Sequence, residues 1–409
     1  MQLIYISPLL IYFPRLISGV ETQPWLAVVV AAFGIATGQN RKVPIAFFVL
    51  AATFLLWISI MSAVGGLPGA TELALILVGP LILFGAMGFE ADPPSRPAMA
   101  IIAVFFAAAA VTEIIFPNTY EDLASLILDR ASVSDGHRGV SLFAPEPTYA
   151  AISVTYFLIL SWWSGKKWGF RYRWIEIVLV LCLLGTASTY AVLLLIALAF
   201  GQWPRAGLVC LAAGLLLAPA LQIVALDNDE AVRGVVAISR LFSTDLNNFL
   251  PSVSEIDSSL GSRLITNVAS LSTPLYYPLG LGLDCGAVPL AFNAAGYDFA
   301  FDNDVLQTVM YEGCLKPQSY SASIALGLGL MAVAFLLMLL LLLRFVQGKL
   351  PYRLWRPPLA VAAVVLVVQG QLTNPIPWLL IFIAMRPVWK KSLAEVRTSP
   401  SYPIYQTVK

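Results

Sequence analysis

Repeated apolar runs of about 20 residues restrict this chain more than any other feature. A run of that length is enough to cross the hydrocarbon core of a bilayer as a helix. Only 11% of the 409 residues are charged, whereas soluble domains carry about 25%. The sequence therefore predicts an all-α polytopic membrane protein, with residues 1–409 forming one integral membrane domain.

The apolar runs alternate with short loops that hold basic residues. The first run lacks a basic start and a clear small-residue cleavage site, so we expect a helix there rather than a signal peptide. Candidate spans lie near residues 1–19, 24–38, 44–64, 70–89, 98–117, 148–164, 174–201, 206–224, 321–343, 358–372 and 376–386. Four basic groups belong in the cytoplasm by the positive-inside rule: Arg41 and Lys42; Lys166, Lys167, Arg171 and Arg173; Arg344, Lys349, Arg353 and Arg356; Arg386, Lys390 and Lys391.

The run 174–201 is too long for one crossing, and Gly185-Thr186-Ala187-Ser188-Thr189 stands at its middle. Residues of this type interrupt a membrane helix where neighbouring structure satisfies the freed backbone groups. A split at this point predicts about twelve crossings with both termini cytoplasmic, and every basic loop then agrees. Two sizeable loops, 118–147 and 225–320, then face the outside.

Arginines in these mostly acidic outer loops are candidates for a functional role. The guanidinium group can bind phosphate oxygens two at a time. Arg138 in the first loop, and Arg240 and Arg263 in the second, are such residues. Arg263 lies next to an apolar helical face formed by positions 260, 264, 268 and 271, so its guanidinium can reach inward. The alternative is an arginine whose stem lies along the membrane interface.

Glu146 stands between Pro145 and Pro147, just ahead of the span that begins near Tyr149. Proline fixes its own φ and restricts the residue before it, so this carboxylate lies on a stiff turn. A stiffly placed carboxylate beside a dehydrated surface suits a general base. The alternative is a helix cap that forms a surface ion pair with Arg138.

Two further segments of the large loop have recognisable local patterns. The stretch 274–282 contains two prolines and two glycines and predicts a tight irregular turn. Asp302 and Asn303 open a stretch with helical apolar spacing that ends at Gly313, which predicts a short helix. Asp302 and Asp304 are either site residues or caps of this helix.

We expect no metal site and no cofactor. His137 is the only histidine, and the four cysteines lack the spacing of zinc ligands. No serine or cysteine triad can be assembled around that one imidazole. The net charge of +1 gives no reason to expect nucleic acid as a partner. Cys285 and Cys314 share the large outer loop, where a disulfide would persist in an oxidising compartment.

Taken in order, the motifs resemble those of the O-antigen polymerase (Wzy) and O-antigen ligase superfamily of bacterial surface-polysaccharide enzymes. The resemblance covers most of the chain. The motifs are Arg-Gly at 138–139, Glu-Pro at 146–147, Thr186-x-Ser188, Gly-Ser-Arg at 261–263, Pro-Leu-Gly-x-Gly at 278–282, Asp-Asn-x-x-Leu at 302–306, and Glu312-Gly313.

The resemblance implies a GT-C-like fold in the bacterial inner membrane, with 118–147 as first and 225–320 as large periplasmic loop. It implies an undecaprenyl-pyrophosphate-linked glycan as donor, attacked at its anomeric carbon by a sugar hydroxyl at the periplasmic face. Arg138 and Arg263 would contact the pyrophosphate, and Glu146 would orient or deprotonate the acceptor hydroxyl. Further candidates for substrate binding are Arg240, Tyr149, Asp302 and Asn303. The lipid bilayer and a chain-length regulator are the expected partners.

One departure separates the branches of that superfamily. Ligases carry His-Asn-x-x-Leu where this chain has Asp302, and His137 lies in the other loop. The pattern therefore favours a metal-independent polymerase of O-antigen or exopolysaccharide over a ligase that transfers glycan to lipid A-core. A transporter of lipid-linked sugars remains an alternative, although the conspicuous charges lie in outer loops and not near the bilayer midplane. A non-catalytic assembly protein is the third alternative.

Overall fold

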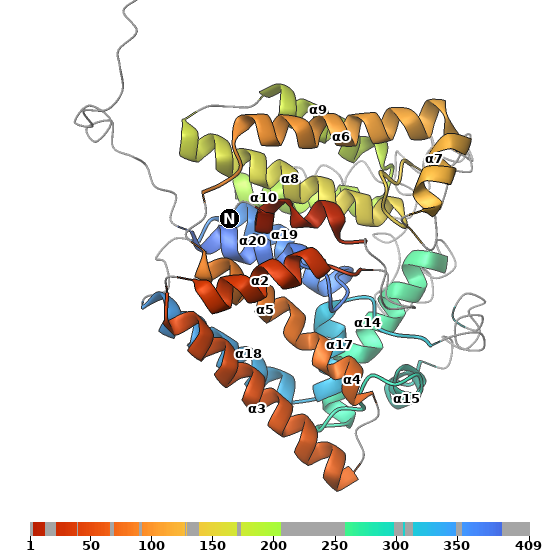
Figure 1. Ribbon diagram of the computed structural model, residues 1–409. Helices are drawn as coiled ribbons and strands as arrows, with labels where there is room; N and C mark the ends of the chain where they lie inside the picture. The colour runs from red at the N-terminus through yellow and green to blue at the C-terminus, as the bar shows by residue number, and fades with distance from the viewer. Residues whose placement is uncertain are drawn as a thin grey trace, which may run out of the picture.

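A computed structural model describes residues 3–12, 22–38, 40–65, 69–89, 92–126, 128, 139–169, 173–205, 258–297, 306, 314–348 and 354–386. Within these ranges the chain forms α-helices and short 3-10 turns, and no β-strand occurs (Figure 1). The predicted all-α class is therefore confirmed. By length and composition, two helical stretches among these residues can cross a membrane, Lys42–Ala63 and Arg96–Ile115.

Two helices, α19 (Arg356–Val368) and α20 (Ile376–Met385), run through the middle of the bundle (Figure 1). They pack against each other and contact helices on both sides. Helix α19 packs against α10 (Thr189–Gln202), and α20 packs against α5 (Val78–Gly88) and α8 (Pro147–Trp168). The core of the protein thus lies around α19 and α20.

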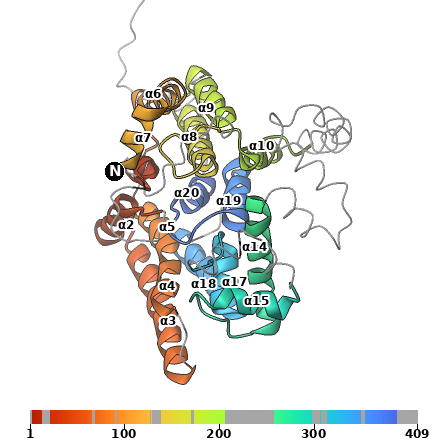
Figure 2. The same ribbon diagram turned by 90° about the vertical axis from the view of Figure 1, so that its right-hand side faces the viewer.

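The other helices cover this pair on two sides. On one side α6 (Arg96–Ile115) and α9 (Arg173–Gly185) pack against α8 and against each other, and the short α7 (Pro117–Ser125) follows α6. On the other side lie the remaining helices, with α14, α15 and α17 grouped together (Figure 2). These are α1 (Leu3–Ile6), η1 (Ser7–Leu10), α2 (Trp25–Thr37), α3 (Lys42–Gly65), α4 (Ala70–Ala74), η2 (Leu75–Leu77), α14 (Ser258–Tyr276), α15 (Ala287–Ala295), α17 (Tyr320–Leu328) and α18 (Met331–Gln347).

Helices α2 and α5 approach each other through glycines. A Cβ atom built on Gly85 would collide with the backbone of Ala31, and one built on Gly88 would collide with the carbonyl group of Gly34. Small residues at such a crossing let two backbones touch, which is how helices associate where no hydrophobic effect drives them together. The close approach of α2 and α5 therefore depends on these glycines.

The described members of the basic loops gather at one end of the bundle, on the left in Figure 1. Arg386 donates a hydrogen bond to the carbonyl oxygen of Phe89 at 2.6 Å. The ammonium group of Lys166 lies 4.1 Å from the ring centroid of Trp355. Such contacts join the ends of α5, α8 and α20 to the start of α19. The loops assigned to one side from their charge thus share one end of the fold, which we call the basic end.

The predicted interruption of the run 174–201 is confirmed. Helix α9 ends at Gly185, and α10 begins after Ser188, whose hydroxyl accepts a hydrogen bond from the Tyr190 N–H at 3.2 Å. A Cβ atom on Gly201 would collide with Pro357, at the start of α19. The end of α10 therefore lies beside the start of α19, at the basic end. Since α9 also begins at that end, the chain reverses its direction at residues 186–188.

Three other spans differ from expectation. In the described part of 1–19, the α-helix α1 ends at Ile6 and the chain continues as the 3-10 turn η1 to Leu10, because Pro8 lacks the N–H that a continuous α-helix needs. The run 321–343 is divided between α17 and α18 at Gly329, whose φ is +57°. The run 358–372 stops being helical after Val368. The span 206–224 lies outside the described residues.

The turn predicted at 274–282 is present from residue 277 onward, whereas residues 274–276 belong to α14, with Pro274 inside that helix. Gly280 and Gly282 have φ values of +83° and +79°, which favour glycine. A Cβ atom on Gly280 would collide with Gly327, and the Leu330 N–H donates to the carbonyl oxygen of Pro278 at 2.7 Å. The turn therefore packs into the break between α17 and α18.

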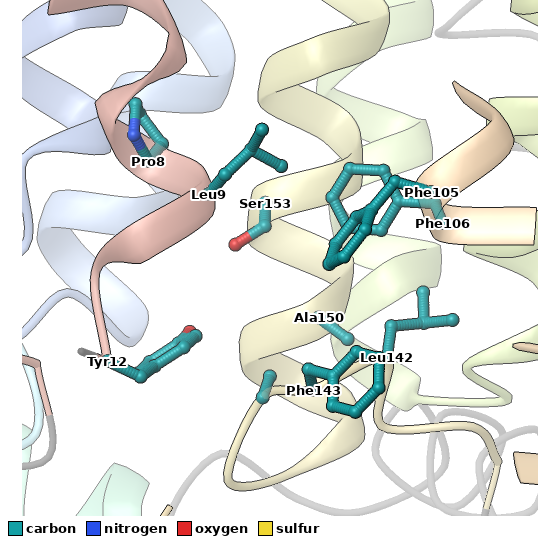
Figure 3. A pocket seen from close by; sticks show the side chains of 10 residues that line it. Pro8, Leu9, Tyr12, Phe105, Phe106, Leu142, Phe143, Ala150 and Ser153 are labelled. Carbon is teal, nitrogen blue, oxygen red and sulfur yellow. The ribbon is translucent and has the colours of Figure 1, made fainter. Parts of the chain in front are cut away.

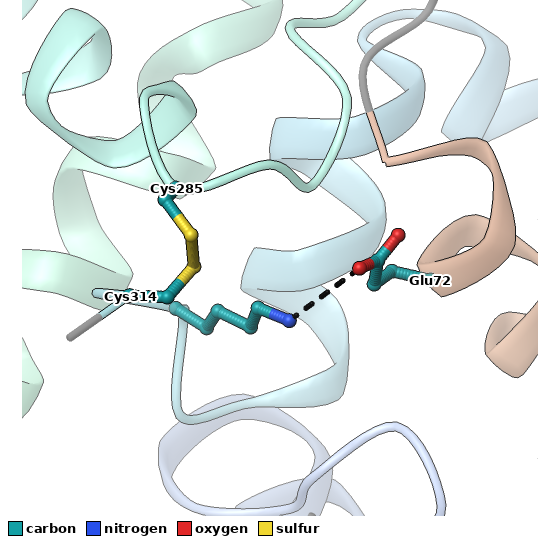
Figure 4. The surroundings of a disulfide bond; sticks show 4 residues. Glu72, Cys285 and Cys314 are labelled. Carbon is teal, nitrogen blue, oxygen red and sulfur yellow. Dashed lines mark ion pairs between the residues drawn. A yellow bond between two sulfur atoms is a disulfide. The ribbon is translucent and has the colours of Figure 1, made fainter. Parts of the chain in front are cut away.

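Cys285 and Cys314 form a disulfide, with their Cα atoms 4.6 Å apart (Figure 4). The bridge ties the start of α15 to the segment that leads into α17. Close by, the Lys316 ammonium lies 3.9 Å from a carboxylate oxygen of Glu72 in α4. Both groups of this ion pair are well exposed, so it contributes little to stability.

We expect that removing the bridge with Cys285→Ser and Cys314→Ser lowers the free energy of unfolding by roughly 3 kcal/mol in the chain-entropy model. Thermal unfolding in detergent should show a lower midpoint for the double variant. A reductant should shift the wild-type midpoint and leave that of the variant unchanged. Free thiols at both positions in non-reducing mass spectrometry would contradict the pairing.

Candidate functional site

A group of polar side chains lies at the end of the bundle opposite the basic end, where α8, α14 and the segment 369–375 meet. Chain segments far apart in sequence contribute to it, so the site exists only in the folded protein. We call it the polar cluster, and it consists of Thr22, Glu146, Tyr149, Arg263, Gln369 and Gln371.

Glu146 and Arg263 form an ion pair at the centre of the polar cluster. The Arg263 Nη2 atom donates to Glu146 Oε2 at 2.5 Å, and Nη1 donates to Gln369 Oε1 at 3.2 Å. The Arg263 side chain is 20% exposed and that of Glu146 is 31% exposed. The guanidinium is therefore partly withdrawn from solvent and held between a carboxylate and an amide.

The helix-cap alternative for Glu146 holds for its position but not for a side-chain hydrogen bond. Glu146 occupies the N-cap position of α8 in extended geometry, with φ −148° and ψ 155°, but its side chain makes no capping hydrogen bond. Pro147 at the first helical position has a fixed φ and no N–H to satisfy, so α8 can begin there without a side-chain cap. This leaves the carboxylate available to reach α14.

Helix α14 presents Arg263 by burying an unexpected face. The apolar positions Leu264 and Val268 are only partly buried, and Leu271 is 41% exposed. Besides Ile265 and Asn267, the buried face carries small and hydroxyl side chains, namely Ser262, Thr266, Ala269, Ser270 and Thr273. The hydroxyls of Thr266, Ser270 and Thr273 return hydrogen bonds to the backbone of α14 itself, so burying them costs little. Small side chains also let α14 approach α17 and α19 closely.

The segment 369–375 supplies the amide side chains that the sequence analysis missed. The Gln371 Nε2 atom donates to the Tyr149 hydroxyl at 2.9 Å, and Gln371 Oε1 accepts from the Thr22 hydroxyl at 2.9 Å. Gln369 is buried, and its Oε1 atom accepts from Arg263. Four polar residues between two apolar runs (Gln369, Gln371, Thr373 and Asn374) were the available signal.

The other predicted site residues have different outcomes. Tyr149 is buried, its hydroxyl is bound by Gln371, and its ring makes an edge contact with Tyr12 at 6.3 Å between centroids. It therefore supports the polar cluster from within. Arg138, Arg240, Asp302 and Asn303 lie outside the described residues.

An apolar groove opens beside the polar cluster, between the N-terminal segment, α6 and α8 (Figure 3). The space enclosed within it is about 20 Å³, and a volume of about 300 Å³ is reached only when the open mouth is included. The Ser153 hydroxyl faces this groove and has no hydrogen-bond partner among the described residues. The lining residues are Pro8, Leu9, Tyr12, Phe105, Phe106, Leu142, Phe143, Ala144, Ala150 and Ser153.

The polar cluster combines a cation, a carboxylate and amide groups, and its Tyr149 ring contacts Tyr12 in the wall of the apolar groove. A guanidinium with a partly exposed edge can bind an anion, and a carboxylate nearby can accept a proton. Within the described ranges, no group of three or more histidine, cysteine or acidic side chains could hold a metal ion. The arrangement suits a ligand with an anionic head and an apolar tail.

Comparison with known proteins gives no relative: no family model, no curated protein and no solved structure matches the chain.

A double-mutant cycle should measure the ion pair. We expect a coupling free energy between Glu146→Gln and Arg263→Ala of about 0.5 to 3 kcal/mol, because the two groups are in contact and partly withdrawn from water. The measurement is the thermal unfolding of the four proteins in detergent. The same cycle for Glu72 and Lys316, which are 3.9 Å apart and more exposed, should give a value near zero. Equal values for the two cycles would contradict a specific contact.

Proposed function

We propose that this chain is a polytopic inner-membrane glycosyltransferase that polymerises undecaprenyl-pyrophosphate-linked oligosaccharide repeat units at the periplasmic face. The observation that carries the proposal is the contact between Arg263 and Glu146 near an apolar groove, whose wall includes Tyr12, a ring neighbour of Tyr149. The proposal accounts for both halves of the site, because a lipid-linked donor has an anionic head and a long apolar tail.

The surface of the bundle supports a membrane location. The peripheral helices α3, α6 and α18 expose large apolar side chains, among them Phe48 at 65%, Ile101 at 70% and Leu341 at 66%. Soluble monomers rarely expose apolar patches of more than a few hundred Å². The glycine contacts between α2 and α5 are typical of helix packing in lipid. The basic end would then face the cytoplasm.

The disulfide supports the orientation of the other end. The bridge between Cys285 and Cys314 adjoins the start of α15, a helix that lies on the side of the molecule away from the basic end (Figure 1). Disulfides persist in the periplasm and are rare in the cytoplasm. The polar cluster, which is at the same end, would therefore meet its substrate on the periplasmic side.

The polar cluster supplies what glycosyl transfer needs at the leaving group and at the nucleophile. The acceptor oxygen forms a bond to the anomeric carbon, and the bond from that carbon to the phosphate oxygen breaks. The pyrophosphate leaves with the bonding electron pair, and Arg263 stabilises its charge. Glu146 takes the proton of the attacking hydroxyl. Arg263 therefore acts on the donor and Glu146 on the acceptor.

The test is to incubate purified protein with a defined undecaprenyl-pyrophosphate-linked repeat unit in liposomes. We expect a ladder of products that grows one repeat unit at a time, resolved by gel electrophoresis and mass spectrometry. Transfer of glycan only to an added lipid A-core acceptor would favour a ligase instead. Movement of the lipid-linked sugar across the membrane without a new glycosidic bond would favour a transporter.

Two variants connect the ladder to the site. Arg263→Lys keeps the charge but loses the two-pronged geometry, and we expect kcat/KM to fall by about 100-fold. Glu146→Gln keeps the size but loses the proton acceptor, and we expect kcat to fall by about 100-fold or more. Lys316→Ala, at an exposed ion pair away from the cluster, is the matched control and should polymerise normally. Normal polymerisation by both site variants would remove the polar cluster from the mechanism.

The groove should distinguish long lipid tails from short ones. Ser153→Leu adds bulk where the side chain faces the groove. We expect KM for the undecaprenyl-linked donor to rise about tenfold, since each CH₂ group displaced from an apolar surface costs about 0.8 kcal/mol. KM for a donor with a two-isoprene tail should stay near its wild-type value, which also serves as the control for folding. An equal rise for both donors would contradict binding of the tail in this groove.

A further inference from the structure

Glu113 is a buried carboxylate to which the proposed mechanism gives no role. It lies near the end of α6 and is 1% exposed. Its two oxygens accept from the Ser141 N–H at 2.8 and 2.9 Å, and one of them accepts from the Leu142 N–H at 3.0 Å. The Ser141 hydroxyl donates to Oε1 at 3.0 Å. A buried carboxylate is tolerated only where such donors replace water, so Glu113 and this loop are matched to each other.

The loop that binds Glu113 has an unfavourable backbone conformation. Leu142 and Phe143 have φ values of +52° and +59°, in the left-handed region that side chains with a Cβ atom disfavour. Such residues persist only where surrounding contacts over-determine them. Successive N–H groups in this kind of turn converge on an anion. Here the anion is the carboxylate of Glu113 from α6.

Tyr120 in α7 completes the attachment of the loop. The Phe143 N–H donates to the Tyr120 hydroxyl at 2.5 Å, and the two rings stack with centroids 4.8 Å apart. The hydroxyls of Tyr120 and Ser141 are also hydrogen-bonded, at 2.8 Å. Burial raises the pKa of Tyr120, so its phenol remains protonated and can donate while it accepts. The loop is thus held from both α6 and α7.

The loop leads directly to the polar cluster. Ala144 donates its N–H to the Ser141 carbonyl at 2.8 Å, and Glu146 follows two residues later. Upstream, the Val140 N–H donates to the Gly185 carbonyl at 3.0 Å, which fixes the other end of the segment. Any change in the backbone at 141–143 would therefore move the carboxylate of Glu146.

We propose that Glu113 is a positioning residue: it holds the loop 139–146 in the conformation that places Glu146 against Arg263. The catalytic consequence rests on the proposed function. Glu113 itself lies beneath the loop with its oxygens occupied by loop donors, so it acts through Glu146 and not on the substrate. The role is separate from that of a base or a phosphate ligand.

Glu113→Gln replaces one acceptor oxygen by an NH₂ group that faces the loop N–H donors. We expect peptides covering 139–146 to exchange amide hydrogens about tenfold faster or more in this variant. Glu121→Gln, the same change at an exposed position of α7, is the matched control and should exchange as the wild type does. Unchanged exchange in Glu113→Gln would overturn the proposal.

Enzyme kinetics separate positioning from general stability. In Glu113→Gln we expect kcat per folded protein to fall about 10- to 100-fold, because a shift of about 1 Å in a catalytic group has effects of that size. KM for the lipid-linked donor should change less than about threefold, because Arg263 is intact. A loosened loop with wild-type kcat and KM, or a lower yield of folded protein with unchanged specific activity, would overturn the positioning role.

Glycine at position 142 provides a rescue test. Leu142→Gly removes the cost of the positive φ, so the loop depends less on Glu113. We expect Glu113→Gln to reduce kcat less in the Leu142→Gly background than in the wild type. Equal losses in both backgrounds would overturn the role of Glu113 in fixing the turn. If Glu113→Gln does not fold, Tyr120→Phe removes the acceptor for the Phe143 N–H and should loosen the same peptides.

The two proposals can fail separately. If the wild-type protein forms no glycosidic bond with lipid-linked repeat units, the proposed function fails. Amide exchange in Glu113→Gln and Glu121→Gln still decides whether Glu113 holds the loop.

Discussion

The structure depends on one constraint. Where the chain leaves a helix in apolar surroundings, its backbone N–H and C=O groups lose their helical partners and must form hydrogen bonds with other groups. The chain leaves its helices in this way at 139–146, 186–188 and 369–375. At each place a polar side chain supplies the missing partner or a cap, as Glu113, Ser188 and Asn267 do. All three breaks lie at the same end of the bundle. The polar cluster is built from the side chains that gather there.

The sequence predicted the helical class, the break in 174–201, the shared side of the basic loops and the glycine turn within 274–282, because each leaves a local pattern. It left the bridge between Cys285 and Cys314 open, because the distance between their backbones depends on the fold. Glu146 and Arg263 were each recognisable from their own surroundings. Their contact was not, because it joins residues 117 positions apart and depends on how α8 and α14 pack. The predicted face of α14 was misleading, since the helix buries hydroxyls that bond to its own backbone. Gln369 was missed because the predicted span 358–372 included it, whereas the helix ends at Val368.

The contact between Glu146 and Arg263 also bears on how the site would bind an anion. Each group neutralises the other, so neither charge is left unpaired in a partly dehydrated place. An anion that binds Arg263 competes with Glu146 for the same N–H groups. Under the proposed mechanism, arrival of the pyrophosphate therefore releases the carboxylate that has to accept a proton. Donor binding and activation of the base are then one event.

The bridge between Cys285 and Cys314 has a topological consequence. Residues 285–314 form a covalent macrocycle, and Asp302 and Asn303 belong to it. A single proteolytic cut inside the macrocycle opens the ring but releases no fragment. The parts of the chain before and after it stay on one molecule until the disulfide is reduced as well. One proteolytic cut between residues 285 and 314 therefore does not separate α14 from α17, which pack against each other.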